Sequence, residues 1–230
     1  MQPYFLPYLG YWQLIREADI FVIYDNIQYT KKGWFNRNYI LCCNKKLCIT
    51  VPIKKDSDYL DVNQRYLSDD YKRHISKIIN QISSNYRRAP YFESVMPFLT
   101  EILSNQEVNL FNYNYHIINA IVDYLEINTK LLVSSSIFID HNQKGQDRVI
   151  SMLKELGASM YINPIGGLDL YNKEAFIEEG IKLRFLESKL PPYRQFEDEF
   201  VPSLSIIDIL MFNDKEKISN MLAEYSILSQ

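Results

Sequence analysis

The chain has 230 residues, of which 47% are hydrophobic and 23% charged, so it can bury a sizeable core as one domain. Its net charge of −3 argues against a general nucleic-acid-binding protein, because such proteins usually carry a basic surface. No apolar run approaches the roughly 20 residues that span a bilayer, and no secretory signal is visible.

The three cysteines lie close together and are odd in number, which is typical of reduced thiols. We therefore expect a cytoplasmic protein with no integral membrane segment. The three histidines are scattered along the chain, so no metal site built from Cys and His is expected.

The first forty residues contain the most informative pattern of the chain. An aromatic, proline-rich turn leads into a predicted helix over residues 10–18 and an apolar strand over residues 20–24, which ends at Asp25. In an open α/β sheet, ligands bind beyond the carboxyl ends of the strands. We therefore place the candidate site here. Because Gln2 and Pro3 precede any possible strand, we also expect a start codon further upstream and a missing first half of strand one.

Two β-rich runs, over residues 39–43 and 47–53, predict a hairpin that turns at residues 44–46. Residues 68–104 then follow a helical pattern that is interrupted at Pro90. We interpret this pair of amphipathic helices as an insert, or a lid, over the sheet. Ordinary helical packing is the alternative and stays open.

The C-terminal half alternates between helices and short strands, which predicts βαβ units. The expected helices cover residues 110–125, 147–156, 172–179 and 215–226, and the expected strands cover residues 130–139, 159–163 and 181–186. The fold class is therefore α/β, with a mostly parallel, Rossmann-like sheet. We expect a single domain over residues 1–230 with a helical insert at about 68–104.

Five polar residues near the first strand have side chains suited to catalysis or recognition. Asp25 is the leading candidate for a catalytic or ligand-orienting carboxylate, with loop capping as the alternative. Gln28, Asn36 and Asn38 can each donate and accept hydrogen bonds, which suits sugar hydroxyls but also suits turns. Arg37 fits a phosphate or carboxylate through its two-pronged guanidinium, or else forms a surface ion pair.

The remaining candidates would contact a substrate, and the alternatives are core packing for the rings, a solvated loop for the lysines, a helix cap for the serines and a turn for the glycines. Aromatic rings would form a stacking floor for a sugar or base, lysines and serines would hold phosphate, and glycines would let the backbone approach a ligand. These candidates are Gln2, Tyr4, Tyr8, Tyr11, Lys31, Lys32, Trp34, Ser134, Ser135, Gly166 and Gly167. Asp208 lies on an apolar helix face and needs a partner, for which Arg194 or Arg37 would serve.

Several of these motifs, in order along nearly the whole chain, resemble the WbqC-like family. The resemblance rests on Gln2-Pro3-Tyr4-Phe5-x-Pro7-Tyr8-x-Gly10-Tyr11, Asp25-x-x-Gln28-Tyr29, Trp34-x-Asn36-Arg37, Leu156-Gly157-Ala158-x-x-Tyr161-Ile162 and Leu204-Ser205-Ile206-Ile207-Asp208. It implies a place in bacterial surface-polysaccharide (O-antigen, lipopolysaccharide) biosynthesis. It also implies a small-molecule substrate, with transfer of glycine or another aminoacyl or acyl group onto a nucleotide-activated sugar. A non-catalytic accessory subunit and an ATP-dependent adenylating ligase stay open as alternatives, and no cofactor is identified.

A weaker similarity, at the level of the fold, links the opening segment to nucleotidyltransferases that carry a His-x-Gly-His signature. The run Ser134-Ser135-Ser136-Ile137 is similar to their second phosphate-binding motif. Tyr8 and Tyr11 stand where the two histidines of those enzymes would stand, so the adenylating chemistry is not carried over. A similarity of this kind sets an expectation for the fold only.

Overall fold

In the computed structural model, which describes residues 1–229, the strand that follows the N-terminal turn pairs with a strand from the middle of the chain. β1 (Ile20–Ile23) and β4 (Lys130–Val133) run parallel, with Ile20 opposite Lys130 and Ile23 opposite Val133. Met1 lies beside β1, since its amino group donates to the Val22 carbonyl at 2.6 Å. Both strands therefore end at the same edge, where Tyr24 and Ser134 follow.

The expected hairpin is confirmed, with a turn slightly earlier than predicted. β2 (Arg37–Cys42) and β3 (Lys45–Thr50) are antiparallel, and Cys42 lies opposite Lys45. The two turn residues, Cys43 and Asn44, both have left-handed backbones, with φ of 47° and 56°. This is the two-residue turn whose twist matches that of paired strands.

A third sheet has the order β5–β6–β7. β5 (Met160–Pro164) runs parallel to β6 (Lys182–Ser188), and β7 (Tyr225–Ser229) runs antiparallel to β6. The mixed α/β class is therefore confirmed, whereas a single, mostly parallel Rossmann-like sheet is not, because the described strands form three small sheets. Alternation along the sequence identifies strands, but tertiary packing selects their neighbours.

The helices follow the predicted pattern closely. They are α1 (Leu9–Glu17), α2 (Tyr71–Tyr86), α3 (Phe92–Leu103), α4 (Leu110–Tyr124), α5 (Gly145–Glu155), α6 (Lys173–Glu178), α7 (Ile206–Phe212) and α8 (Lys215–Leu222). Two expectations were wrong: the strand predicted over 130–139 ends at Val133 and continues as a 3-10 turn (Ser134–Ser136), and the last helix ends before β7. No helix among residues 1–229 is long and apolar enough to cross a bilayer.

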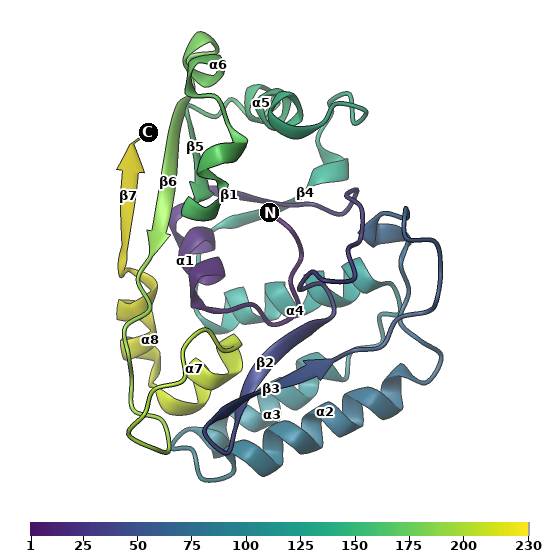
Figure 1. Ribbon diagram of the computed structural model, residues 1–230, viewed down its shortest axis with the longest axis vertical. Helices are drawn as coiled ribbons and strands as arrows, with labels where there is room; N and C mark the ends of the chain where they lie inside the picture. The colour runs from purple at the N-terminus through teal and green to yellow at the C-terminus, as the bar shows by residue number, and fades with distance from the viewer. Residues whose placement is uncertain (230) are drawn as a thin grey trace.

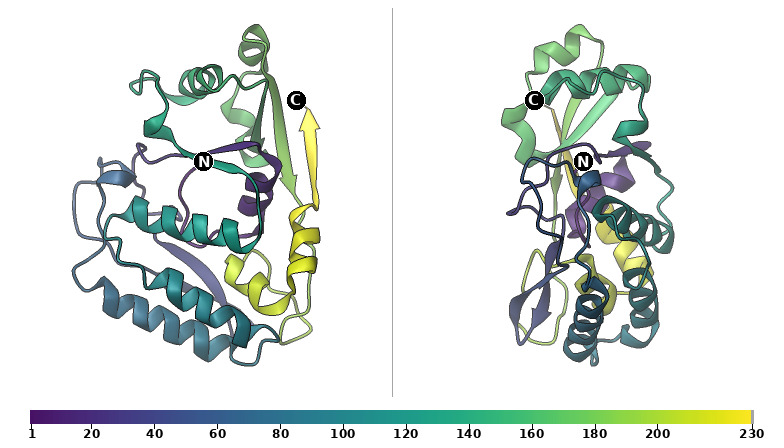
Figure 2. Two further views of the ribbon diagram at one scale, coloured as in Figure 1. Left: turned by 180° about the vertical axis from the view of Figure 1, so that it is seen from behind. Right: turned by 90° about the vertical axis from the view of Figure 1, so that its right-hand side faces the viewer.

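Two groups of buried side chains organise the molecule. The larger contains residues of α1 to α4, α7 and α8 together with β1 to β3. The smaller joins α5, α6, β5 and β6 through residues such as Val149, Phe176 and Phe185. Figures 1 and 2 place the sheet β5–β6–β7 with α5 and α6 at one end of the long axis, and α2 and α3 at the other.

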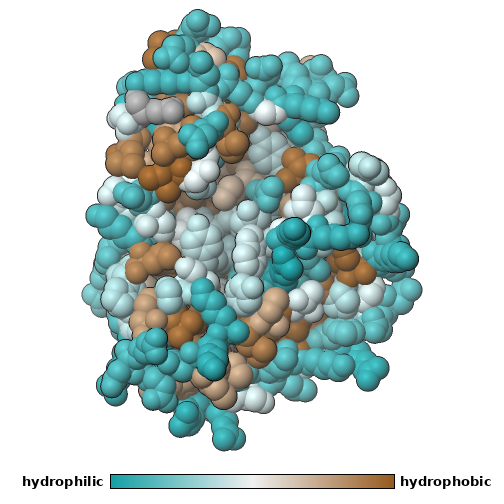
Figure 3. All heavy atoms as spheres, in the orientation of Figure 1, coloured by the Kyte–Doolittle hydropathy of each residue, from teal (hydrophilic) through white to brown (hydrophobic). Residues whose placement is uncertain are grey.

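Helices α2 and α3, the predicted insert, pack into the larger core. The Leu41 backbone amide of β2 donates to the Tyr86 hydroxyl of α2 at 2.8 Å. Val95, Leu99 and Ile102 of α3 are buried in the same core as the N-terminal turn. Figure 3 shows the molecule from the same side as Figure 1. On this side the surface is hollowed below the end that carries α5 and α6, and pale side chains of intermediate hydropathy lie across the middle.

Candidate functional site

Asp25 lies at the carboxyl end of β1 and is held by three separate donors. Its Oδ1 accepts from the Ser134 hydroxyl at 2.9 Å and from the Ser135 backbone amide at 3.0 Å. Its Oδ2 accepts from Asn63 Nδ2 at 2.9 Å. Asp25 is only 5% exposed. The parallel pairing of β1 with β4 explains this arrangement, because it brings Ser134, distant in sequence, directly to Asp25.

Asn26, His141 and Arg148 extend this network. Asn26 Oδ1 accepts from Arg148 and lies 2.6 Å from the Ser134 hydroxyl, whose single hydrogen is shared between Asn26 and Asp25. Asn26 Nδ2 lies 3.1 Å from His141 Nδ1. The Arg148 guanidinium also donates to the Asn26 carbonyl at 3.1 Å and lies over the Tyr24 ring, 5.2 Å from its centroid. A buried cation is thus bonded to the residue that follows the buried carboxylate.

The environment of Asp25 favours its ionised form. Burial by itself raises the pKa of Asp25, but hydrogen bonds from Ser135, Asn63 and Ser134 outweigh this effect and hold the pKa below its usual value. A carboxylate with a lowered pKa is a weak base at neutral pH and a good acceptor of hydrogen bonds. Asp25 is therefore suited to orienting a donor group rather than to removing a proton.

Tyr161 of β5 and Tyr171, which follows a 3-10 helix (Ile165–Leu170), lie near Tyr24 at the end of β1. The Tyr161 hydroxyl lies 3.1 Å from that of Tyr171 and 3.2 Å from Asn163 Oδ1. Burial, followed by the nearby Tyr171, raises the pKa of Tyr24 to about 12, while Arg148 opposes the rise. Burial also raises the pKa of Tyr161, so the hydroxyls of Tyr24 and Tyr161 stay protonated at neutral pH and can donate hydrogen bonds.

The two candidate glycines, Gly166 and Gly167, follow β5 beside this group. A Cβ on Gly167 would overlap the Asn163 side chain, whereas one on Gly166 would meet no described atom within 4 Å. Gly167 therefore permits the close approach of Asn163, and Gly166 is exposed.

The cationic candidates of the loop after β1 are mostly engaged with neighbouring groups. Arg37 donates to the carbonyls of Gly33 at 3.1 Å and Lys32 at 2.6 Å, which braces the loop. Lys31 forms an exposed ion pair with Asp58 at 2.9 Å. Gln28 donates to the Asp58 carbonyl at 2.8 Å, and the side chain of Lys32 is exposed.

The two buried amides in this loop hold backbone segments together. Asn36 Nδ2 donates to the Val51 carbonyl at 2.8 Å. Asn38 Nδ2 donates to the carbonyls of Phe5 at 2.9 Å and Leu6 at 2.7 Å. Leu6 has a φ of 47°, so Asn38 stabilises a strained part of the N-terminal turn. Both amides are therefore committed to backbone groups other than those that hold Asp25.

The aromatic candidates divide between core and surface. Tyr11 is buried and donates to the Gln2 carbonyl at 2.9 Å, so it does not face a ligand. Tyr8 and Trp34 are each more than one-third exposed, and Tyr4 is half-buried with its ring 5.7 Å from that of Tyr11. Of the four candidates, Tyr4, Tyr8 and Trp34 thus remain available as a wall for a sugar.

Among residues 1–229, Asp208 pairs with no cation, contrary to the expectation of Arg194 or Arg37. It accepts instead from Tyr86 at 2.8 Å, Gln195 at 2.7 Å and Tyr193 at 2.5 Å. Burial raises its pKa, and these three donors oppose the rise. The arrangement joins α7 to α2 and is structural.

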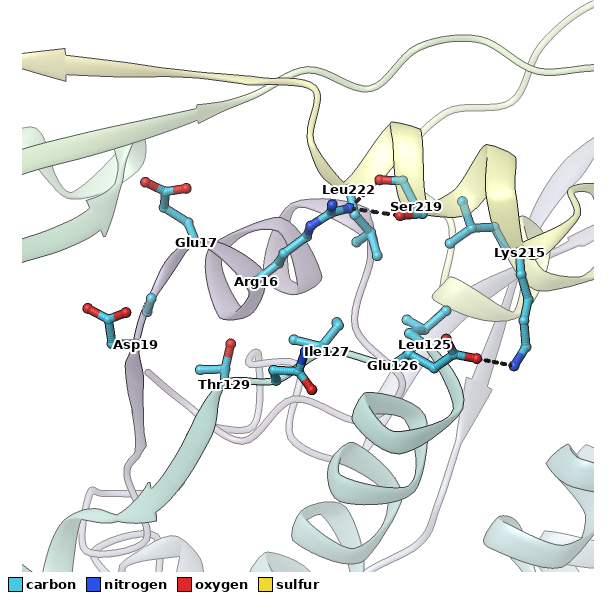
Figure 4. A pocket seen from close by; sticks show the side chains of 13 residues that line it. Arg16, Glu17, Asp19, Leu125, Glu126, Ile127, Thr129, Lys215, Ser219 and Leu222 are labelled. Carbon is cyan, nitrogen blue, oxygen red and sulfur yellow. Dashed lines mark hydrogen bonds and ion pairs between the residues drawn. The ribbon is translucent and has the colours of Figure 1, made fainter.

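Two pockets accompany this architecture. The first, of about 470 Å³, lies at the amino ends of β1 and β4, and Figure 4 shows its Lys215–Glu126 ion pair and the contact of Arg16 with Ser219. That edge is opposite to Asp25. The second, of about 450 Å³, lies between Tyr29 and residues 53–58, on the flank of the predicted site.

Four residues of the network were absent from the sequence-based candidates: Asn26, Asn63, His141 and Arg148. Asn26 directly follows Asp25, so its position in the polar run was a usable signal. Arg148 interrupts an otherwise apolar face of α5 that includes Val149, and a cation at such a position indicates a buried partner. No local pattern identifies Asn63 or His141, because only the fold brings them to β1.

Comparisons with known proteins show which family the chain belongs to. A protein of Mycobacterium tuberculosis (strain ATCC 25618 / H37Rv), named "Uncharacterized protein Rv1507c", is 29% identical over 215 residues, which cover 91% of this chain and 90% of that protein. No solved structure matches the chain. The model of the WbqC-like protein family matches residues 2–220, and the chain therefore belongs to that family.

Proposed function

We propose that this protein is a transferase that moves an aminoacyl group, such as glycine, or an acyl group onto a nucleotide-activated sugar during surface-polysaccharide (O-antigen) assembly. The observation that carries the proposal is the buried carboxylate of Asp25, fixed at the carboxyl ends of β1 and β4 with Arg148 close by. Oδ2 of Asp25 accepts from Asn63, and a carboxylate oxygen can accept more than one hydrogen bond, so a hydroxyl or amino group of a ligand can also donate to it.

In the proposed reaction, Asp25 orients the amino or hydroxyl group of the sugar. The nitrogen or oxygen of that group forms a bond to the acyl carbon of the donor, and the bond from that carbon to the donor's leaving group breaks. The acceptor's proton passes to the leaving group or to water, since the lowered pKa of Asp25 makes it a poor proton acceptor. Orientation alone can accelerate such a reaction strongly.

The rest of the site would recognise the sugar and its phosphates. Tyr4, Tyr8 and Trp34 offer ring faces beside the N-terminal turn, and aromatic faces commonly pack against sugars and bases. Arg148 supplies a positive charge next to Asp25, and Ser135 lies in the exposed 3-10 turn after β4. A network that contains both a carboxylate and a guanidinium suits a polar ligand with hydroxyl and phosphate groups.

Two alternatives fit the structure less well. An accessory subunit would expose an apolar patch around the helices of residues 68–104, yet none of the exposed large apolar side chains found in residues 1–229 comes from that segment. An adenylating ligase needs donors to phosphate at the positions of Tyr8 and Tyr11, and Tyr11 is buried against the Gln2 carbonyl. Both observations favour the transferase.

The test is a product assay by mass spectrometry. The purified protein is incubated with UDP- and dTDP-amino sugars and with acyl-CoAs as donors. Glycine plus ATP is tested separately, and product formed only with that pair would indicate the ligase instead. The proposal expects a nucleotide sugar heavier by the transferred group, with at least about tenfold less product from Asp25→Asn. The exposed variant Asp198→Asn, which changes the same charge, should keep full activity. A lack of product with every donor, or full activity of Asp25→Asn, would reject the proposal.

A further inference from the structure

The pocket between Tyr29 and residues 53–58 carries an excess of positive charge. Its lining includes four cationic side chains, those of Lys31, Lys54, Lys55 and Arg65, against two carboxylates in the same loop. The volume of about 450 Å³ is within the range of small-molecule sites. The pocket shares no lining residue with the larger pocket at the amino ends of β1 and β4.

Arg65 is the unusual member of this group, because it is only 3% exposed. Its guanidinium donates to the carbonyls of Ser57 at 2.6 Å and Lys54 at 3.1 Å, and it lies over the Tyr29 ring at 4.9 Å. Its Nε is buried and has no hydrogen-bond partner in the described structure. Within residues 1–229, no carboxylate forms an ion pair with Arg65. A buried cation without a counter-charge is costly, so an anion in the pocket would stabilise it.

The surrounding charges do not neutralise Arg65. The ion pairs Lys31–Asp58 and Lys54–Asp69 are both largely exposed, and pairs of that kind are weak. Lys55 is exposed at the rim. The same charges act on the Tyr29 hydroxyl. Burial raises its pKa, the nearby Arg65, Arg37 and Lys31 oppose the rise, and Asp58 adds to it.

We propose that this pocket binds a phosphoryl group, with Arg65 and Lys55 as its principal cationic contacts. An arginine guanidinium matches phosphate oxygens in geometry and charge, and Lys55 adds a flexible point charge. The pocket also lies beside the Asp25 network, because Asn63, which donates to Asp25, is two residues before Arg65. The inference does not depend on group transfer, since a phosphate would bind whether or not the protein is a transferase.

The test is isothermal titration of the full chain with inorganic pyrophosphate at low salt. Lys55→Glu should weaken binding by at least about tenfold, because it replaces an attractive charge with a repulsive one. Lys46→Glu makes the same change on the exposed part of β3 and should bind within about twofold of the wild-type affinity. Arg65→Gln, checked for folding by circular dichroism, should weaken binding as well.

Further titrations separate the sources of the phosphate and the two sites. Tighter binding of UDP than of pyrophosphate, with competition between them, would assign the pocket to a nucleotide; equal binding would assign it to a free phosphate. Either result supports a phosphoryl site, and unchanged affinity of Asp25→Asn would keep it distinct from the Asp25 network. An absence of pyrophosphate binding by the wild-type protein, or wild-type affinity in Lys55→Glu, would overturn the proposal.

Discussion

Replacing Asp25 with asparagine tests whether the carboxylate is held in its ionised form by its neighbours. In the folded protein, three hydrogen bonds reach this carboxylate, from Ser134, the Ser135 amide and Asn63. The substituted carboxamide can keep its oxygen on the Ser134 side, and the Asn63 side chain can turn so that its oxygen accepts from the new NH₂ group. The variant therefore keeps the hydrogen bonds but loses the negative charge that strengthens them. Because of this loss, we expect Asp25→Asn to lower the free energy of unfolding by about 2–3 kcal/mol near neutral pH.

The pH dependence of that difference provides the sharper test. The pKa of Asp25 is lowered in the folded protein, so the stability it contributes is fully present above the unfolded value of about 3.9. That contribution is lost as the pH falls through the lower folded value. The difference in the free energy of unfolding between wild type and Asp25→Asn should therefore become smaller below about pH 4.

Urea unfolding between about pH 7 and pH 3, followed by the fluorescence of Trp12 and Trp34, measures this gap directly. The exposed variant Asp198→Asn controls for the loss of one negative charge and should stay within about 0.5 kcal/mol of wild type. A gap that stays constant down to the lowest pH, or an Asp25→Asn variant as stable as wild type at neutral pH, would refute the reasoning.

Three further changes test other contacts by the same unfolding measurement. Tyr86→Phe should cost about 2–4 kcal/mol, because it leaves the Leu41 amide and Asp208 without their shared hydroxyl; an equal loss from Tyr66→Phe, at an exposed position, would contradict this. Asn38→Ala should cost about 2–4 kcal/mol, since the carbonyls of Phe5 and Leu6 lose their donor; an unchanged urea midpoint would count against it. Gly167→Ala should cost about 1–3 kcal/mol through overlap with Asn163, whereas Gly166→Ala should be nearly neutral, and the reverse order would be inconsistent with the structure.

Local signals in the sequence were sufficient for most elements but not for their arrangement. Apolar periodicity located α2, α3 and α4, and the Asn-containing turn located the β2–β3 hairpin. β7 was missed because Tyr225–Ser229 directly follows α8 and looks like its continuation. The three-sheet arrangement could not be predicted, because pairing of β1 with β4 depends on contacts between residues far apart in the chain.

The candidate site, too, could be predicted only in part from the sequence. Asp25 was recognisable because it follows an apolar strand, where parallel sheets collect polar groups, and Ser134 because it begins a run of three serines after the apolar residues 131–133. Their direct hydrogen bond depends on the parallel register of β1 and β4. The buried amides Asn36 and Asn38 look identical in sequence to recognition residues, and only their bonds to backbone carbonyls identify a bracing function.

The most direct test of the Asp25 site is a thermal-shift titration with UDP- and dTDP-amino sugars on wild type, Asp25→Asn and Asp198→Asn. A ligand at about 100 times its Kd stabilises the folded state by about 2.7 kcal/mol, which corresponds to a shift of several degrees. We predict that wild type and Asp198→Asn gain this shift beyond the one that UDP or dTDP alone produces, and that Asp25→Asn does not. An equal shift in all three proteins, or no shift with any nucleotide sugar, would contradict a sugar-binding site at the carboxyl ends of β1 and β4.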